Sequence, residues 1–394
     1  MPMHAYRVTL YASYIGYITQ AIVNNLPSLL FVTFTLEFSV TLEQIGSLIA
    51  INFITQMITD TLTGRYIDKI GYKIAMILAD ILAIIGLFSF SILPYFIEPY
   101  IALLIAMVFA AIGGGLCEVL VSPIVESLPL SDKESRMSLL HSFYSWGQAA
   151  VVLIATLYFI VFGISNWRIL PLIFMIVPFI DAILFYKAKV IEPRSEKDYS
   201  KGSIFKDKDF RILIVIMACA GASEITMSQW SSLFAEEALG ISKTIGDLLG
   251  PMAFALCMGL ARLYYSKKRD LKIEDSLFTS SILCIISYLL VVLSPIPLLS
   301  LLGCALCGSA VGFMWPGTFS LAAGAFPKAK TAMFAILALA GDVGCALGPF
   351  ITGQVSGLMH LDTDVSLRVG LAFGVLFPFI MFIVLLKKRS AFKL

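Results

Sequence analysis

The sequence predicts an all-α integral membrane protein with twelve membrane-spanning helices, arranged as two six-helix halves related by pseudo-two-fold symmetry. Of its 394 residues, 59% are hydrophobic and only 14% are charged. A soluble chain of this length could not bury so much apolar surface. Uncharged apolar stretches of ~20 residues or more, the length that crosses a bilayer core, recur along the whole chain. We therefore expect a multi-pass protein of the cell (plasma) membrane, with the lipid bilayer as its main partner.

The apolar stretches define the expected spans in order. They lie at about 8–36, 44–66, 74–95, 99–128, 137–162, 167–187, 209–235, 244–266, 274–293, 297–324, 331–358 and 366–386. The one long polar segment, 191–208, separates a domain of residues 1–190 from a domain of residues 209–394. A faint repeat accompanies the division, because Asp60, Gly64 and Asp68 close the second span as Arg262, Ser266 and Asp270 close the eighth. Repeated halves are common in transporters.

Lysine and arginine gather in the loops of one side of the expected membrane. The loops of the other side hold only Arg168, Lys243 and Arg368. Because positive residues are enriched in cytoplasmic loops, both termini and the 191–208 segment are expected to be cytoplasmic.

Several classes of function lack their sequence signals. The chain has three histidines and no metal-ligand cluster, nucleophile motif or phosphate-binding loop, so we expect no enzyme, no metal and no cofactor. No basic and aromatic cluster suggests nucleic acid as a partner. The seven cysteines all fall in apolar segments, which is typical of packing.

The loop after the second span carries a motif. It reads Gly64-Arg-Tyr-Ile-Asp68-Lys69-Ile-Gly71-Tyr72-Lys73. This resembles the major facilitator signature G-x-x-x-D-(R/K)-x-G-(R/K)-(R/K), with Tyr72 in place of a basic residue. The resemblance implies the major facilitator fold and a conformational latch formed by Gly64, Asp68, Lys69, Gly71 and Lys73. Asp68 would then hold the halves together, near the amino end of the eleventh span around Lys330 and Thr331.

Within that superfamily, the chain is most similar to the fucose and glucose/galactose–proton symporter group. The segment Gly115-Leu-Cys-Glu118-Val-Leu-Val-Ser122-Pro123 is similar to that group's G-x-L-E-x-x-x-N-P, and Asn24-Asn25-Leu26 to its N-N-L. Glu224 after Gly221 resembles its seventh-span G-x-E. The chain departs from the group at Ser28, where those symporters carry an acidic residue. The resemblance implies proton-coupled sugar import.

Acidic residues inside a span are costly, at roughly 2.5–3.5 kcal/mol each, and usually mark function. Glu118, Glu224 and Asp342 lie well inside spans. We expect Glu118 to couple transport to protons, with Glu224 second, because a carboxylate in a closing cavity can load and release a proton. Asp60, Asp80 and Asp181 lie nearer the cytoplasmic ends, where they are expected to reach interfacial water.

Polar residues also recur at helical spacing in the first, fourth, fifth and seventh spans, which indicates a common water-filled centre. Interhelical hydrogen bonding is the alternative, and we favour it for Asn25 and Gln56. Asp342 either binds substrate or pairs with a basic residue such as Arg262. Trp167, at an outer edge, is expected to anchor the interface. The expected substrate-binding residues are Gln20, Asn24, His141, Tyr144, Gln148, Gln229, Trp230 and Asp342.

These features predict a monomeric secondary active transporter whose partners are a small-molecule substrate and protons. The substrate is expected to be a small polar solute, above all a sugar, imported by alternating access. A drug or metabolite exporter is an alternative, although the fifth span, Tyr144–Gly163, lacks the glycine-proline motif of family exporters. An uncoupled facilitator is another.

Overall fold

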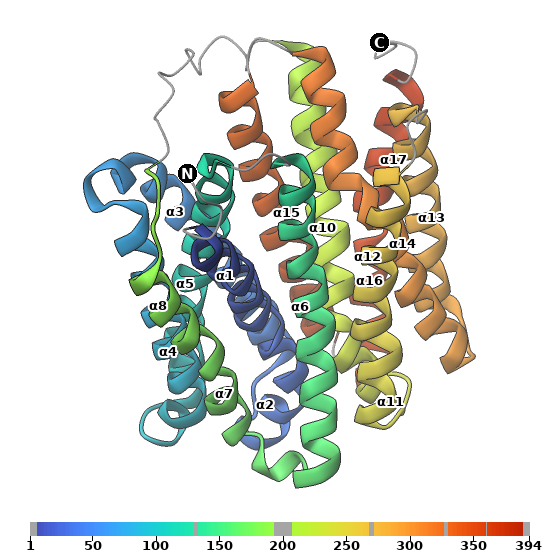
Figure 1. Cartoon of the computed structure of the whole chain (residues 1–394). Helices are drawn as coiled ribbons and strands as arrows, with labels where there is room; N and C mark the ends of the chain where they lie inside the picture. Colours follow the sequence, from blue (N-terminus) through green and yellow to red (C-terminus); the bar gives the residue numbers. More distant parts are fainter. Residues whose placement is uncertain are drawn as a thin grey trace. The chain divides into compact units, whose positions relative to one another are not determined.

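A computed structural model describes residues 6–129, 133–192, 207–267, 272–326, 330–359 and 361–388. These residues are almost entirely helical and contain no strand. Twelve stretches within them are long and apolar enough to cross a membrane, which confirms the predicted count. The helices, several labelled in Figure 1, are α1 (Arg7–Asn25), η2 (Pro27–Leu30), α2 (Phe31–Phe38), α3 (Leu42–Ile70), α4 (Tyr72–Ile92), η3 (Leu93–Tyr95), α5 (Pro99–Ser127), α6 (Lys133–Phe162), η4 (Ile164–Asn166), α7 (Ile169–Phe174), α8 (Ile176–Lys187), α10 (Lys208–Glu237), α11 (Lys243–Asp247), η5 (Leu248–Met252), α12 (Ala253–Lys267), α13 (Ile273–Leu293), α14 (Pro297–Ala325), α15 (Lys330–Leu358), α16 (Thr363–Gly374) and α17 (Leu376–Lys388).

The chain divides into two compact units. Unit 1 comprises Met1–Val40 and Ile51–Ser195, and unit 2 comprises Thr41–Ala50 and Glu196–Leu394. The first residues of α3 therefore group with unit 2, through contacts to α15 such as the bond from Gln354 Nε2 to the Glu43 carbonyl oxygen at 3.3 Å. The division expected from the sequence followed the polar segment 191–208 alone and stays a prediction.

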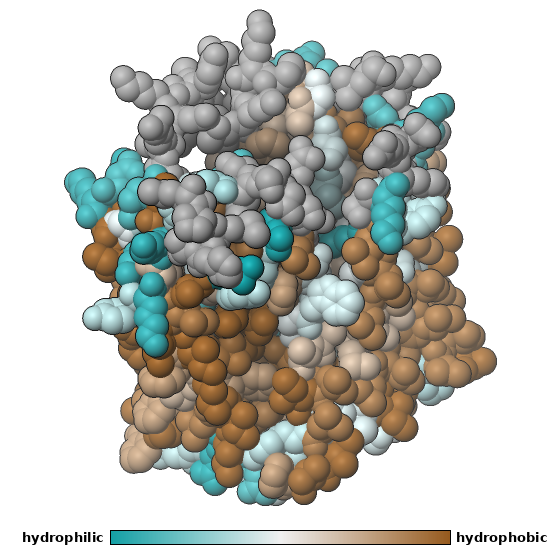
Figure 2. Space-filling view, viewed as in Figure 1, coloured by the Kyte–Doolittle hydropathy of each residue, from teal (hydrophilic) through white to brown (hydrophobic). Residues whose placement is uncertain are grey.

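Unit 1 is built around α1, which packs against α4, α5, α6 and α8. Its core cluster joins Tyr14 and Tyr17 of α1 with Ala79 of α4, Cys117 of α5 and Phe185 of α8. Most of the outer surface is apolar at middle height on the face that Figure 2 shows. An apolar surface of this kind suits lipid rather than water as its solvent.

Unit 2 contains a close helix contact between α10 and α15. Gly221, Gly344 and Gly348 lie in this contact, and a Cβ atom on Gly344 would overlap the Ala218 carbonyl oxygen. Small residues permit such an approach between membrane helices. The glycines of α15 thus serve helix packing.

Several spans expected to be continuous are interrupted, among them the eighth, where the π-helical turn Leu248–Met252 separates α11 from α12. The first span changes to a 3₁₀ turn at Pro27–Leu30, which separates α1 from α2. The sixth breaks at Met175 and the twelfth at Val375. The breaks at Met175 and Val375 each lie three residues before a proline, Pro178 or Pro378. Proline lacks the N–H that would complete the helical hydrogen bonds at that point.

Candidate functional site

A hydrogen bond joins two of the predicted residues in unit 1. Gln20 Nε2 of α1 donates to Glu118 Oε2 of α5 at 2.7 Å. Gln20 is buried and Glu118 is half-buried. The bond joins α1 to α5 inside unit 1.

Next to this pair, two hydroxyl groups and an imidazole lie together, and only the imidazole was predicted as part of the site. Tyr17 Oη lies 2.9 Å from Ser122 Oγ and 3.3 Å from His141 Nδ1. His141 was predicted to bind substrate, whereas Tyr17 was not predicted. Its signal was its position three residues before Gln20, on the same face of α1.

Asn24 lies one turn further along α1 and joins it to α3. Its Oδ1 accepts from Gln56 Nε2 at 2.9 Å and from Asn52 Nδ2 at 3.4 Å. Gly114 of α5 faces it, since a Cβ there would lie 3.5 Å from Asn24 Oδ1. The interhelical bond expected for Gln56 is therefore present, and it is made to a predicted binding residue.

The remaining predicted residues of unit 1 lie on α6. Gln148 is buried, and Tyr144 is half-buried against the core cluster of the unit. Trp146, between them, is 59% exposed and therefore points away from that core. The helix thus turns Tyr144 and Gln148 inward and Trp146 outward.

In unit 2 an ion pair links two helices. Glu224 Oε1 of α10 lies 3.8 Å from Arg262 Nη2 of α12. Glu224 is buried, and no hydrogen-bond donor of the described residues reaches its Oε2. Arg262, which the sequence offered as a partner for Asp342, thus pairs with Glu224.

The other predicted residues of unit 2 are also buried. Gln229 and Trp230 lie in the same helix as Glu224, and Trp230 Nε1 finds no acceptor among the described residues. Asp342 is buried on α15. The preceding residue, Gly341, is covered by the ring of Trp315, which was not predicted as a site residue.

The predicted latch segment forms the turn between α3 and α4. Gly71, the residue directly before α4, has φ of +83°, a conformation that favours glycine. Glu192 Oε2 accepts from Tyr72 N at 3.2 Å, and Lys73 Nζ donates to the Ala188 carbonyl oxygen at 3.2 Å. Gly64, Asp68 and Lys69 are exposed. Asp270 and the side chains of Ser266, Lys330 and Thr331 lie outside the described residues.

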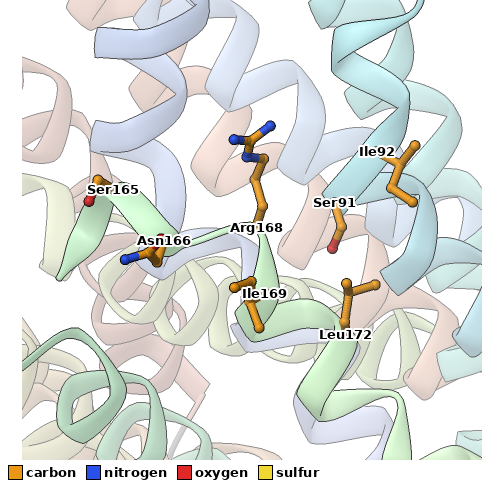
Figure 3. A pocket seen from close by; sticks show the side chains of 7 residues that line it. All are labelled: Ser91, Ile92, Ser165, Asn166, Arg168, Ile169 and Leu172. Atoms are coloured by element: carbon orange, nitrogen blue, oxygen red, sulfur yellow. The ribbon is translucent and has the colours of Figure 1, made fainter. Parts of the chain in front are cut away.

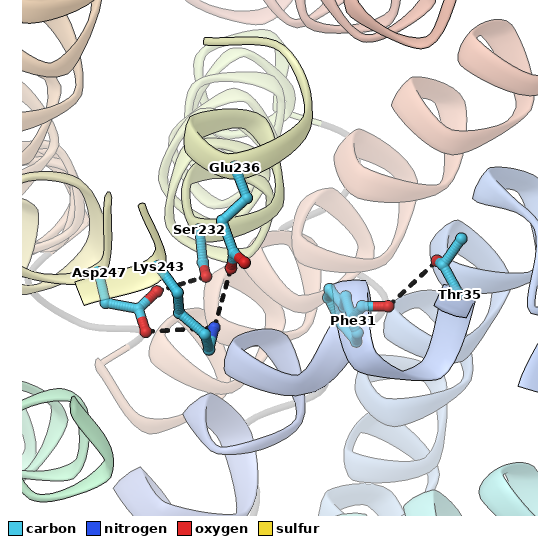
Figure 4. Close-up of polar contacts among 6 residues, drawn as sticks. All are labelled: Phe31, Thr35, Ser232, Glu236, Lys243 and Asp247. Atoms are coloured by element: carbon cyan, nitrogen blue, oxygen red, sulfur yellow. Dashed lines mark hydrogen bonds and ion pairs between the residues drawn. The ribbon is translucent and has the colours of Figure 1, made fainter. Parts of the chain in front are cut away.

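A second buried charge network lies in unit 2, where α10 meets α11 (Figure 4). Lys243 Nζ lies 3.0 Å from Glu236 Oε1 and 3.2 Å from Asp247 Oδ2. Ser232 Oγ donates to Asp247 Oδ1 at 2.5 Å. The group fixes α11 on α10 and contains none of the predicted residues.

A cavity of about 270 Å³ lies between the end of α4 and the η4–α7 segment of unit 1 (Figure 3). Ser91, Asn166 and Arg168 line it together with apolar side chains. It contains none of the residues predicted for substrate or proton binding, so it is not the candidate site. No group of acidic, histidine or cysteine residues suited to a metal ion occurs in the described part of the chain.

Two expectations for polar residues are wrong. Asp80 and Asp181 were expected to reach interfacial water, yet both are 0% exposed. Trp167 was expected at the membrane interface, yet it is buried and its Nε1 donates to Glu37 Oε2 at 2.6 Å. In each case neighbouring helices cover a side chain that the linear sequence places near the end of a span.

Twelve helices long and apolar enough to cross a membrane, with carboxylates and amides paired between them, are typical of a polytopic membrane protein. The chain belongs to the Major Facilitator Superfamily, whose family model matches residues 13–349. No curated protein sequence matches the chain significantly.

Solved transporter structures share the fold over nearly the whole chain. A bacterial homologue of the human lysosomal transporter Spinster, inward-facing and occupied, has 15% identity and a TM-score of 0.75, covering 97% of this chain and 96% of that one. The nucleoside transporter NupG (D323A mutant) has 13% identity and a TM-score of 0.79, covering 97% and 99%. A D-xylose–proton symporter has 17% identity and a TM-score of 0.70, covering 95% of each chain.

Proposed function

We propose that this protein is a secondary transporter that moves a small polar solute, above all a sugar, together with a proton by alternating access. The observation that carries the proposal is the Glu118–Gln20 hydrogen bond of 2.7 Å inside unit 1. It places a protonatable group directly against an amide that can also bind a solute. The structural neighbours named for D-xylose with protons and for nucleosides support a cargo of this kind.

The residues around the pair support a neutral, hydroxyl-rich solute. Tyr17, Ser122 and His141 offer groups that both donate and accept, and Asn24 and Gln148 add amides. The hydroxyl groups of a sugar also donate and accept hydrogen bonds, so these side chains can pair with them in either role. In unit 2, Gln229, Trp230 and Asp342 are proposed to contribute to binding as well. Glu224 is proposed as the second proton-coupling residue.

The proposed coupling uses the change in polarity around Glu118. When water reaches the carboxyl group its ionised form is stabilised, and when the surroundings close its protonated form is stabilised. A protonated Glu118 can donate to the solute or to Gln20, whereas an ionised Glu118 only accepts. Proton binding and solute binding thereby influence each other through one pair of side chains.

The test compares Glu118→Gln with the wild type in proteoliposomes. A panel of sugars, nucleosides, organic acids and drugs is first screened for ligands that raise the melting temperature, because binding stabilises the folded state. With such a ligand, Glu118→Gln is expected to retain binding and counterflow and to lose accumulation driven by a proton gradient. Glu224→Gln is expected to weaken accumulation less.

The matched control is Glu126→Gln, which removes an exposed carboxyl group from the same helix α5. It should accumulate the ligand like the wild type. If Glu118→Gln does so too, Glu118 is structural and the coupling proposal for it fails. Absence of gradient-driven accumulation in the wild type would instead indicate a facilitator, and efflux of a drug against its gradient would indicate an exporter.

A further inference from the structure

Two aspartates that are not part of the Glu118–Gln20 pair lie together in the interior of unit 1. Asp80 is on α4 and Asp181 on α8, and both side chains are 0% exposed. The two helices pack against each other, and the two carboxyl groups lie close enough to influence each other electrostatically. None of their four oxygen atoms accepts a hydrogen bond from any other donor of the described residues. Within the described residues, neither carboxyl group thus has a hydrogen-bond donor to satisfy it.

The surroundings of the pair are tightly packed and apolar. A Cβ atom on Gly16 of α1 would lie 3.3 Å from Asp181 Oδ2, 3.3 Å from Met76 Cε and 3.1 Å from Val121 Cγ2. The absence of a side chain at Gly16 thus lets α1 close directly over the carboxyl group. Met76 and Val121 belong to the core cluster of the unit, so the pair lies at the edge of a packed core.

The titratable groups around the pair do not supply a compensating positive charge. From α5 the neighbours are the Cys117 thiol and, next in sequence, Glu118. From α1, the titratable groups are the phenols of Tyr14 and Tyr17, which belong to the core cluster that contains Met76 and Val121. Lys73, two turns before Asp80, is directed to the Ala188 carbonyl oxygen, and α7 carries no titratable residue.

Two adjacent carboxylates in such an environment repel each other strongly, and neither can donate a hydrogen bond to the other. One added proton resolves both problems, because a protonated carboxyl group donates to its ionised neighbour. We propose that Asp80 and Asp181 form a proton-binding site in which one proton is shared between the two carboxyl groups. The bound ligand is a proton from solvent, and no other bond changes.

The proposal has a measurable consequence for stability. At neutral pH the unfolded chain carries both aspartates ionised, whereas the folded chain holds one proton between them. The folded state thus binds more protons, so stability falls as pH rises. Asp80→Asn and Asp181→Asn supply an amide donor in place of the proton, and the pH dependence contributed by the pair should be lost.

The experiment records melting temperature against pH for purified wild type, Asp80→Asn, Asp181→Asn and the exposed control Glu126→Gln. The wild type and the control should lose stability toward alkaline pH, with a flatter profile for either aspartate variant. Equal slopes in all four proteins would overturn the proposal. Gly16→Ala, which presses on Asp181 without removing a carboxyl group, should lower stability and keep the slope.

Infrared spectroscopy tests the wild type itself, should the aspartate variants fail to fold. At neutral pH the protein should show the carbonyl band of a protonated carboxylic acid, and carboxyl-¹³C labelling of aspartate should shift it. In Asp80→Asn or Asp181→Asn the band should disappear. A wild type with no protonated aspartate refutes the shared proton. The result is independent of solute uptake, so it can fail while the Glu118 proposal stands.

Discussion

Glu224 and Asn24 lie 200 residues apart in sequence and occupy equivalent places in the first span of each half. Asn24 is neutral, and two amide groups satisfy it. Glu224 carries a charge, and a neutral amide would leave much of that charge uncompensated in a buried helix. The Arg262 guanidinium at 3.8 Å supplies the compensation.

Removing one partner of this pair should therefore cost more than removing both. Arg262→Met is expected to lower the free energy of unfolding by up to about 3 kcal/mol, the low end for a broken buried pair, because Arg262 is 30% exposed. The double variant Arg262→Met/Glu224→Gln should recover most of that loss. Thermal unfolding of the purified proteins measures both. A double variant no more stable than Arg262→Met would show that Glu224 does not need the arginine.

Individual site residues were predictable only where they formed a pattern. Gln20, Asn24 and Glu118 stand at helical spacing among apolar residues, and the structure joins them to polar partners. Tyr17 resembles any other aromatic residue of a membrane helix, so the only signal for its hydroxyl contacts was its place on the Gln20 face of α1. Asp80 and Asp181 were misjudged because depth in a membrane and burial under a neighbouring helix are different quantities, and only packing sets the second.

At the scale of elements, an arginine contacts the end of the third span from the sixth in each half, although the two contacts differ in kind. Arg168, just before α7, places its guanidinium 4.4 Å from the Tyr95 ring at the end of the third span. Arg368, 200 residues later on α16, donates to the carbonyl oxygens of Val291, Val292 and Ser294 at the end of α13. The proline breaks at Pro178 and Pro378 repeat at the same interval. These devices preserve the repeat more clearly than the sequence itself does.

The turn between α3 and α4 offers a paired test of two motif glycines. Gly71 has φ of +83° and ψ of 141°, so alanine there should cost about 1–3 kcal/mol of backbone strain. Gly64 lies in the α3 helix with nothing within 4 Å of an added Cβ, so alanine there should be neutral or stabilising. Melting temperatures of Gly71→Ala and Gly64→Ala check this. Equal values would mean that the turn tolerates alanine.

For the whole molecule, span number follows from sequence because the length of an apolar stretch is set by the bilayer, whichever neighbours it has. The breaks within spans depend on single prolines that other helices tolerate, such as Pro123 inside α5. The grouping of residues 41–50 with unit 2 depends on contacts between α3 and α15, which no local pattern announces.

The three cations of the proposed outer loops all have structural partners. Arg168 stacks on Tyr95, Lys243 pairs with Glu236 and Asp247, and Arg368 caps α13. The presence of these three cations therefore leaves the difference in Lys and Arg content between the two sides of the membrane as a guide to orientation.

We predict that both termini and the 191–208 segment are cytoplasmic. A cysteine at Ser200 should resist a membrane-impermeant thiol reagent in intact cells and react after lysis. A cysteine at Ser165, exposed in the loop before α7, should react in intact cells. Native background is low, since six of the seven cysteines are buried. External labelling at Ser200 would reverse the topology.

Alternating access requires a device that holds one closed state, and we propose that Asp68 acts in this role. Asp68 is exposed on α3, so its removal should leave the stability of unit 1 almost unchanged. Loss of a contact made only in one closed state changes the free energy of that state and the rates at which the states interconvert, while the side chains of a distant binding site stay the same. Asp68→Asn should therefore slow transport about tenfold, a change of about 1.4 kcal/mol in the barrier, with ligand affinity preserved.

Initial uptake rates and binding isotherms of the same preparation measure the two effects, with Asp68→Glu as the variant that keeps the charge. Equal turnover of Asp68→Asn and wild type in vesicles would remove Asp68 from the mechanism, whereas a matching loss of affinity would place it at the binding site.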